Sequence, residues 1–211
     1  MKAFHISYMA LALTSSHQVF ANTDLVRAEI PNCNYTKLVV NAPSTLKLIA
    51  QGQPSGSVQG TDKELGYLKY KCSKGTLEID TKRNASIRKG FNFDLTNGSI
   101  KTVILNGSQQ ARISELATKE FSLASYGSTK SVISGKVEYF NVTADGEANV
   151  DSSTLESQKG KIGLNGSGSV KINSSEELSA DVNGSGQIEY IGTPKQLDVS
   201  FNGTGSISKI N

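Results

Sequence analysis

The sequence predicts an all-β protein: a right-handed, single-stranded parallel β-helix with coils of about 19 residues, entered through an irregular, strand-rich N-terminal section. Three observations lead to this fold. Small polar residues alternate with Val, Ile, Leu and Phe, which is typical of strands and tight turns. An apolar–Asn–Gly–Ser/Thr signature recurs through the second half of the chain. The glycines of these copies are spaced by 20, 19, 20, 18 and 19 residues, at Gly107, Gly127, Gly146, Gly166, Gly184 and Gly203.

The residues around these glycines keep one apolar register. Apolar side chains recur four residues before all six glycines, and two residues before or four residues after most of them, as at Val103, Leu105 and Ala111. Because successive side chains of a strand point to opposite sides, these positions form columns inside the coil. Glycine supplies the positive φ of the corner. A period near 19 is too short for helical-hairpin repeats of about 33 residues or more and for four-stranded propeller blades.

The asparagines before the glycines predict a ladder of stacked turns. Its members are Asn106, Gly107, Asn165, Gly166, Asn183, Gly184, Asn202 and Gly203. Side-chain amides stack in this way in repeated strands. The column is either a structural ladder, whose side chains satisfy turn backbone groups, or a polar binding ridge. The two middle copies, at Tyr126 and Asp145, have lost the asparagine.

Residues 22–211 are predicted to form one domain, with the irregular section over 22–100 and the regular coils over 101–211. The irregular section contains strand-like patterns at 38–40, 46–49 and 75–79. Residues 52–60, which contain Pro54 and several glycines, are expected to form a turn region. Residues 62–70 are expected to hold a short helical turn before a strand at 68–72.

The first 21 residues have the pattern of a signal peptide. Lys2 provides a positive charge, residues 4–13 are mostly apolar, and residues 19–21 resemble a signal peptidase site. A buried N-terminal helix is the alternative. The leader contains both His and both Met residues, and the chain has no Trp, so the mature protein lacks all three. This excludes His-based acid–base chemistry, His-activated nucleophiles and His-ligated metals. We expect an exported protein, either periplasmic or secreted to the cell surface.

Cys33 and Cys72 are the only cysteines. Export places them in an oxidising compartment, so a disulfide between them is predicted. A loop of about 40 residues closed in this way stabilises a fold by roughly 3–4 kcal/mol on the loop-entropy model. Two free buried thiols are the alternative.

Two charged segments are candidates for chemistry. Lys82, Arg83, Arg88 and Lys89 lie within eight residues, just before Phe91 and Phe93, and form either an anion-binding site or a solvated basic loop. Asp145, Glu147 and Asp151 surround one turn and form either an acid–base pair or calcium site, or a solvated turn. No catalytic, cofactor-binding or metal-binding residues are predicted beyond these alternatives. The formal charge of +3 argues against nucleic acid as a partner.

The chain resembles a family of exported bacterial domains of unknown function, the auto-transporter adhesin head, or GIN, domains. The resemblance covers about residues 35–210. It is carried by the opening strand at 35–40, by Gly-Thr-Leu-Glu-Ile at 75–79, and by the segment 188–194, which precedes one more coil at 202–206. It implies a parallel β-helix. The two middle coils without asparagine and the cysteine pair depart from the family pattern.

These features together predict an exported, non-enzymatic binding or structural module of the bacterial cell envelope, adhesin-like or in contact with a glycan or envelope protein. The alternative is a carbohydrate-active β-helix enzyme, a polysaccharide lyase or hydrolase that uses carboxylates. Asp and Glu side chains from two or more coils meeting in one groove would favour the enzyme. The open end at 207–211 could mediate self-association. No segment after the leader is apolar enough to cross a membrane.

Overall fold

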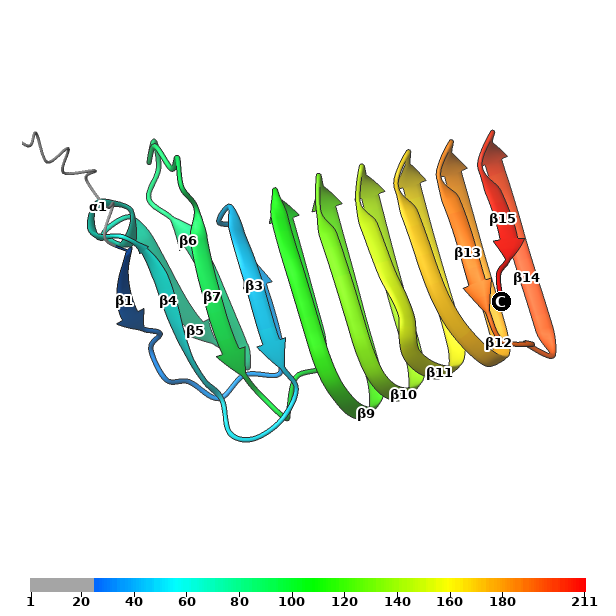
Figure 1. Ribbon diagram of the computed structural model, residues 1–211, viewed down its shortest axis with the longest axis horizontal. Helices are drawn as coiled ribbons and strands as arrows, with labels where there is room; N and C mark the ends of the chain where they lie inside the picture. The colour runs from blue at the N-terminus through cyan, green and yellow to red at the C-terminus, as the bar shows by residue number, and fades with distance from the viewer. Residues whose placement is uncertain (1–24) are drawn as a thin grey trace, which may run out of the picture.

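The computed structural model describes residues 25–211, and most of them lie in strands. Figure 1 shows these strands stacked along the long axis of the molecule, with the N-terminal strands at one end and the last coil at the other. The predicted signal peptide over 1–21 lies outside the described residues.

Four long strands form one coil each: β9 (Gln109–Gly127), β10 (Lys130–Gly146), β11 (Asn149–Gly166) and β12 (Ser169–Gly184). A further coil is divided into β13 (Gln187–Ile191) and β14 (Gln196–Gly203), and β15 (Ser206–Lys209) begins the next coil by pairing with β13. Parallel pairing places the six repeat glycines in register, so that they bound five turns. The predicted parallel β-solenoid is therefore confirmed.

The turn at Gly127 shows why glycine is required. Its φ is +102°, and a Cβ placed there would lie 2.6 Å from the carbonyl oxygen of Gly107 in the preceding coil. Both the backbone conformation and the close stacking therefore exclude a side chain.

Each coil is bent, which gives the solenoid two faces. Face A consists of the segments that follow the glycine turns, and face B of the segments that precede the next ones. Towards the N-terminus, face A continues through β3 (Ser44–Ile49), β7 (Phe91–Thr96), β4 (Ser55–Thr61) and β1 (Leu25–Glu29). Face B continues through β8 (Thr102–Gly107), β2 (Lys37–Val40), β6 (Thr76–Thr81) and β5 (Leu68–Ser73).

The core lies between the two faces, and the predicted apolar columns fill it. Val103, Leu105 and Ala111 are buried, as are most of their equivalents in later coils. Ser152 interrupts one column, but its buried hydroxyl donates a hydrogen bond to the carbonyl oxygen of Lys171. Phe201 occupies an interior column yet is 45% exposed, because β14 pairs on one side only.

The predicted turn region at 52–60 is wrong in its second half. Strand β4 begins at Ser55 and pairs antiparallel with β1 and β7. Its Val58 is buried in the core. Gly56 lies against Leu95 and Gly60 against Phe91, so closely that neither position has room for a Cβ without a shift. These glycines therefore permit close packing within a strand, rather than marking a turn.

The N-terminal end carries the antiparallel strands β1, β4 and β5 and the short helix α1 (Asp62–Leu65). The helical turn predicted at 62–70 is thus present. The predicted disulfide between Cys33 and Cys72 is also present and ties the chain before β2 to β5, with a Cα–Cα distance of 6.3 Å.

Candidate functional site

A groove crosses the N-terminal half of face A. Three adjoining hollows of about 490, 510 and 410 Å³ form it over β4, β7, β3, β9 and β10. The first and second hollows share Thr45 and Gln110, and the second and third share Lys47 and Asp94. The three hollows therefore lie side by side along face A, and together they are called the groove below.

Strand register brings three cations together in the groove. Lys47 on β3 is the direct neighbour of Arg112 on β9, and Lys130 on the next strand, β10, is the direct neighbour of Gln110, two residues before Arg112. All three side chains are exposed. The ion pairs within residues 25–211 involve none of them. Because neighbouring strands lie about 4.8 Å apart, the charges of Lys47 and Arg112 repel each other. Asp94 on β7 is the other register neighbour of Lys47, whereas Arg112 and Lys130 have no carboxylate beside them in register and can attract an anion.

The predicted basic segment contributes half of its charges to this site. Arg88 and Lys89 line the groove, while Lys82 and Arg83 are exposed on the same loop away from it. Phe91 and the neighbouring Phe93 are buried in the core. The aromatic rings are thus structural, and the loop residues 82–90, called the basic loop below, bring positive charge to one side of the groove.

Glu64 of α1 anchors the basic loop. The backbone N–H groups of Arg88 and Lys89 donate to its Oε1 over 2.7 and 3.1 Å. The side chain is only 5% exposed. Burial alone raises the pKa of this carboxyl, but the two N–H donors, the Thr61 contact and the nearby Lys89 charge outweigh it and hold the pKa below its ordinary value. The Glu64 carboxyl is therefore ionised when it holds the basic loop in place.

Polar uncharged side chains lie between the cations. Thr45, Asn92 and Gln110 line the groove and are exposed. The hydrogen bonds found among residues 25–211 use none of their side-chain groups. Their donors and acceptors are therefore available to a ligand.

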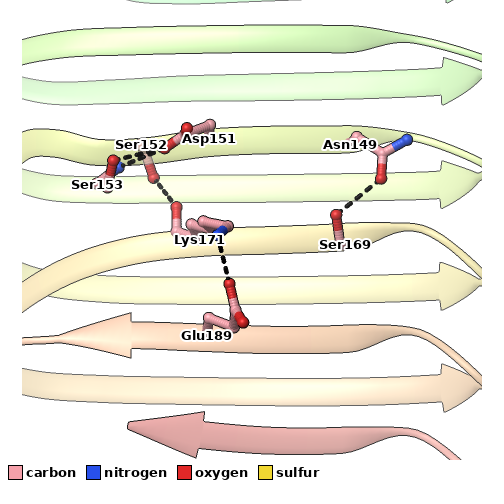
Figure 2. Close-up of polar contacts among 7 residues, drawn as sticks. All are labelled: Asn149, Asp151, Ser152, Ser153, Ser169, Lys171 and Glu189. Carbon is pink, nitrogen blue, oxygen red and sulfur yellow. Dashed lines mark hydrogen bonds and ion pairs between the residues drawn. The ribbon is translucent and has the colours of Figure 1, made fainter. Parts of the chain in front are cut away.

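The C-terminal half of face A differs, because its charged groups satisfy one another (Figure 2). Lys171 Nζ lies 2.6 Å from Glu189 Oε2 on the next strand, and this contact raises the pKa of Lys171. Asp151 accepts a hydrogen bond of 2.6 Å from the Ser153 hydroxyl, which lowers the pKa of Asp151. This half of face A presents few free charges to a partner.

The predicted turn ladder forms in part, on face B. Asn183 donates to Asn165 over 2.9 Å, and Asn165 donates to Asp145 over 2.6 Å. Asn106 donates to Asn41 of the N-terminal section, so Tyr126 separates two short ladders. Asn202 is in register with Asn183, but no hydrogen bond between the two is present. The bonds run from coil to coil, which is what a structural ladder requires.

The carboxylates around the turn at Gly146 do not meet. Asp145 belongs to the ladder on face B, whereas Asp151 lies on face A and Glu147 accepts a hydrogen bond from Ser128 at the edge. Within residues 25–211 no group of three His, Cys, Asp or Glu side chains is placed to hold a metal ion. In the same range, no helix combines the length and apolar character needed to cross a membrane.

Sequence reasoning missed Lys47, Arg112, Lys130 and Glu64. The three cations are far apart in the sequence and form no local cluster, so only the strand register reveals them. Glu64 had a local signature, since Thr61 stands three residues before it and caps α1 by accepting its N–H.

Comparison with known proteins places this fold among bacterial structures. A "putative adhesin" from Bacteroides fragilis has a TM-score of 0.68 at 16% identity, with 89% of this chain and 97% of that chain covered. A "putative adhesin" from Parabacteroides merdae has a TM-score of 0.54 at 14% identity, with 90% of this chain and 98% of that chain covered. A "putative lipid binding protein" from Parabacteroides distasonis has a TM-score of 0.51 at 19% identity, with 90% of this chain and 98% of that chain covered. At such identities the likeness concerns the fold.

No functionally curated protein matches the chain. A family model described as "Putative auto-transporter adhesin, head GIN domain" matches residues 34–194, which is most of the chain. The chain therefore belongs to the auto-transporter adhesin, head GIN domain family.

Proposed function

We propose that this protein is an exported, non-enzymatic binding module of the bacterial cell envelope, and that the groove on face A is its binding site. The observation that carries the proposal is the group of cations lining the groove, Lys47, Arg112 and Lys130, which take part in none of the ion pairs found among residues 25–211. A face with a purely structural role would be more stable if its charges were paired, as they are in the C-terminal half of face A.

Two further findings support this function. The family is described by an adhesin head, and two structures of the same fold are described as adhesins. The signal peptide pattern at 1–21 and the disulfide between Cys33 and Cys72 both suit an oxidising compartment outside the cytoplasm. The periplasm and the cell surface both meet this condition.

A carbohydrate-active enzyme is the second candidate, and one observation favours it. Glu29 on β1 and Asp94 on β7 both line the hollow over β4. They lie two strands apart, about 10 Å by ordinary strand spacing, which is close to the separation used by inverting glycosidases. Both side chains are exposed, however, and so lack the burial that a glycosidase's general acid uses.

The test is a binding screen of the mature protein against envelope glycans and envelope proteins, with release of oligosaccharides measured in the same samples. Binding without release supports the proposed function. Release that disappears in Glu29→Gln and Asp94→Asn variants supports the enzyme instead. If the protein neither binds nor cleaves any component, the proposed function is wrong.

A further inference from the structure

We propose that the groove binds a segment of an acidic polysaccharide, with Lys47, Arg112 and Lys130 contacting its anionic groups and the basic loop closing one side. This inference rests on the proposed binding function and names the chemical class of the ligand.

The charge balance of the groove is the first argument. Six cations and three carboxylates line it, whereas the whole chain has 22 basic and 19 acidic residues. The cations are Arg27, Lys47, Arg88, Lys89, Arg112 and Lys130. A depression lined mainly by one sign of charge concentrates the field and attracts ligands of the opposite sign.

The arrangement of these charges is the second argument. Lys47 and Arg112 are register neighbours on adjacent strands and repel each other; Asp94 on β7 flanks Lys47 on its other side, whereas Arg112 has only Lys47 and Val132 beside it. An anionic group bound between them would remove that repulsion. The guanidinium of Arg112 can also bind a carboxylate or sulfate through two parallel hydrogen bonds.

The polar groups between the cations point to a sugar. Thr45, Asn92 and Gln110 offer a hydroxyl and two amides, which can both donate to and accept from sugar hydroxyls. The groove crosses β4, β7, β3, β9 and β10, so it is roughly 19 Å long by ordinary strand spacing. An extended oligosaccharide fits such a length better than a single small anion does.

The same features disfavour a membrane surface. The exposed large apolar side chains found among residues 25–211 are Leu25, Val26, Tyr126, Tyr139, Leu197 and Phe201, and none of them lines the groove. Proteins that lie on bilayers bury apolar side chains in the headgroup region. The cations here line a depression, which an extended chain can enter and a flat bilayer cannot.

The experiment measures affinity by titration calorimetry for three probes at low and high salt: polygalacturonate, heparin fragments and neutral dextran. Phosphatidylglycerol vesicles are the fourth probe. The variant Lys47→Gln/Arg112→Gln/Lys130→Gln removes the cations of the groove. The control Lys71→Gln/Lys161→Gln/Lys195→Gln removes the same charge from exposed lysines that lie outside the groove and take part in none of the ion pairs of the described part of the chain, 25–211. Circular dichroism and thermal melts establish that each variant folds.

We expect salt-sensitive binding of at least one acidic polysaccharide, weakened on the order of tenfold or more in the groove variant and within about twofold of wild type in the control. If the groove variant does not fold, Arg88→Gln/Lys89→Gln on the basic loop replaces it, with a smaller loss expected.

Equal binding by wild type and groove variant, a preference for dextran, or binding to vesicles alone would overturn the acidic-polysaccharide assignment while leaving a binding function in place. Absence of binding to these probes and to every component of the envelope screen would overturn both the acidic-polysaccharide assignment and the proposed binding function.

Discussion

The two halves of face A are built on the same register but differ in how completely their charges are paired. In one outward-facing column, Asp151, Lys171 and Glu189 alternate in sign along β11, β12 and β13. In the same column of the N-terminal half, Asp94 and Lys47 are neighbours of opposite charge, but the next neighbour, Arg112, has the same sign as Lys47 and no carboxylate beside it. The fold does not require this repulsion, since the C-terminal coils avoid it. The difference therefore separates a half in which polar side chains support the coils from a half that has charge available for a ligand.

The largest expected effect is on the N-terminal region as a whole. Replacing both cysteines, as Cys33→Ser/Cys72→Ser, should lower the free energy of unfolding by about 2–4 kcal/mol, because the loop between them is then free in the unfolded state. Denaturant unfolding measures the loss. Hydrogen exchange should rise in β2, β5 and β6 and stay unchanged in β11 to β13. Equal acceleration in both regions would show that the two halves do not differ in this way.

A smaller effect is expected from Glu64→Ala, which leaves the N–H groups of Arg88 and Lys89 without their acceptor. The loss should be about 1–3 kcal/mol, the range for unsatisfied buried groups. Amide exchange in the basic loop should accelerate at the same time. Glu176→Ala, at an exposed carboxylate in no hydrogen bond or ion pair found among residues 25–211, is the matched control and should change stability by a few tenths of a kcal/mol. Similar losses in both variants would contradict the anchoring role.

Exchanging the charge patterns of the two halves should change stability least. Arg112→Glu replaces the like charge beside Lys47, whose other register neighbour is Asp94, and should raise the melting temperature by at most about 4 °C, whereas Glu189→Lys puts a like charge beside Lys171 and should lower it by a similarly small amount. Binding should respond more strongly, with anion binding lost in the first variant only. Thermal melts at low salt, followed by the polysaccharide titration, measure both quantities. A destabilised Arg112→Glu variant would show that the like charges do not repel.

The anchor also predicts a pH dependence without any mutation. Because the pKa of Glu64 is lower in the folded than in the unfolded protein, its stabilisation is present above the ordinary glutamate pKa of about 4.3 and is lost as the pH falls through the lower folded value. In an NMR titration, the Glu64 carboxyl should titrate below the ordinary value. The amide signals of Arg88 and Lys89 should shift with the same midpoint. A midpoint above the ordinary value would contradict the assigned cause.

The sequence predicts the coils well and the groove poorly, for a physical reason. Coil corners need glycine locally, so the spacing from Gly107 to Gly203 reveals them, and the two cysteines leave one possible intramolecular disulfide. Strand β4 was missed because Gly56 and Gly60 look like turn residues, although they serve close packing.

The groove depends on contacts between residues that are distant in the sequence. Lys47 and Arg112 meet only because β3 stacks directly on β9, across an insertion that contains β4 to β8. Of the predicted basic cluster at 82–89, Arg88 and Lys89 line the groove and Lys82 and Arg83 do not; anion binding by this cluster stays a prediction. The local density of basic residues in the sequence predicted the basic loop, whereas the groove could be recognised only from the register of the strands.

The most direct test of a ligand-binding groove is residue-resolved NMR mapping of a chain that spans residues 22–211 during titration with an acidic oligosaccharide, such as a polygalacturonate fragment. The account predicts salt-sensitive shifts of the amide signals of β7, β3, β9 and β10, including those of Lys47 and Arg112, with the face A segments of β11 to β13 unchanged. Shifts centred on β11 to β13 or on face B, or no shifts at saturating concentration, would contradict it.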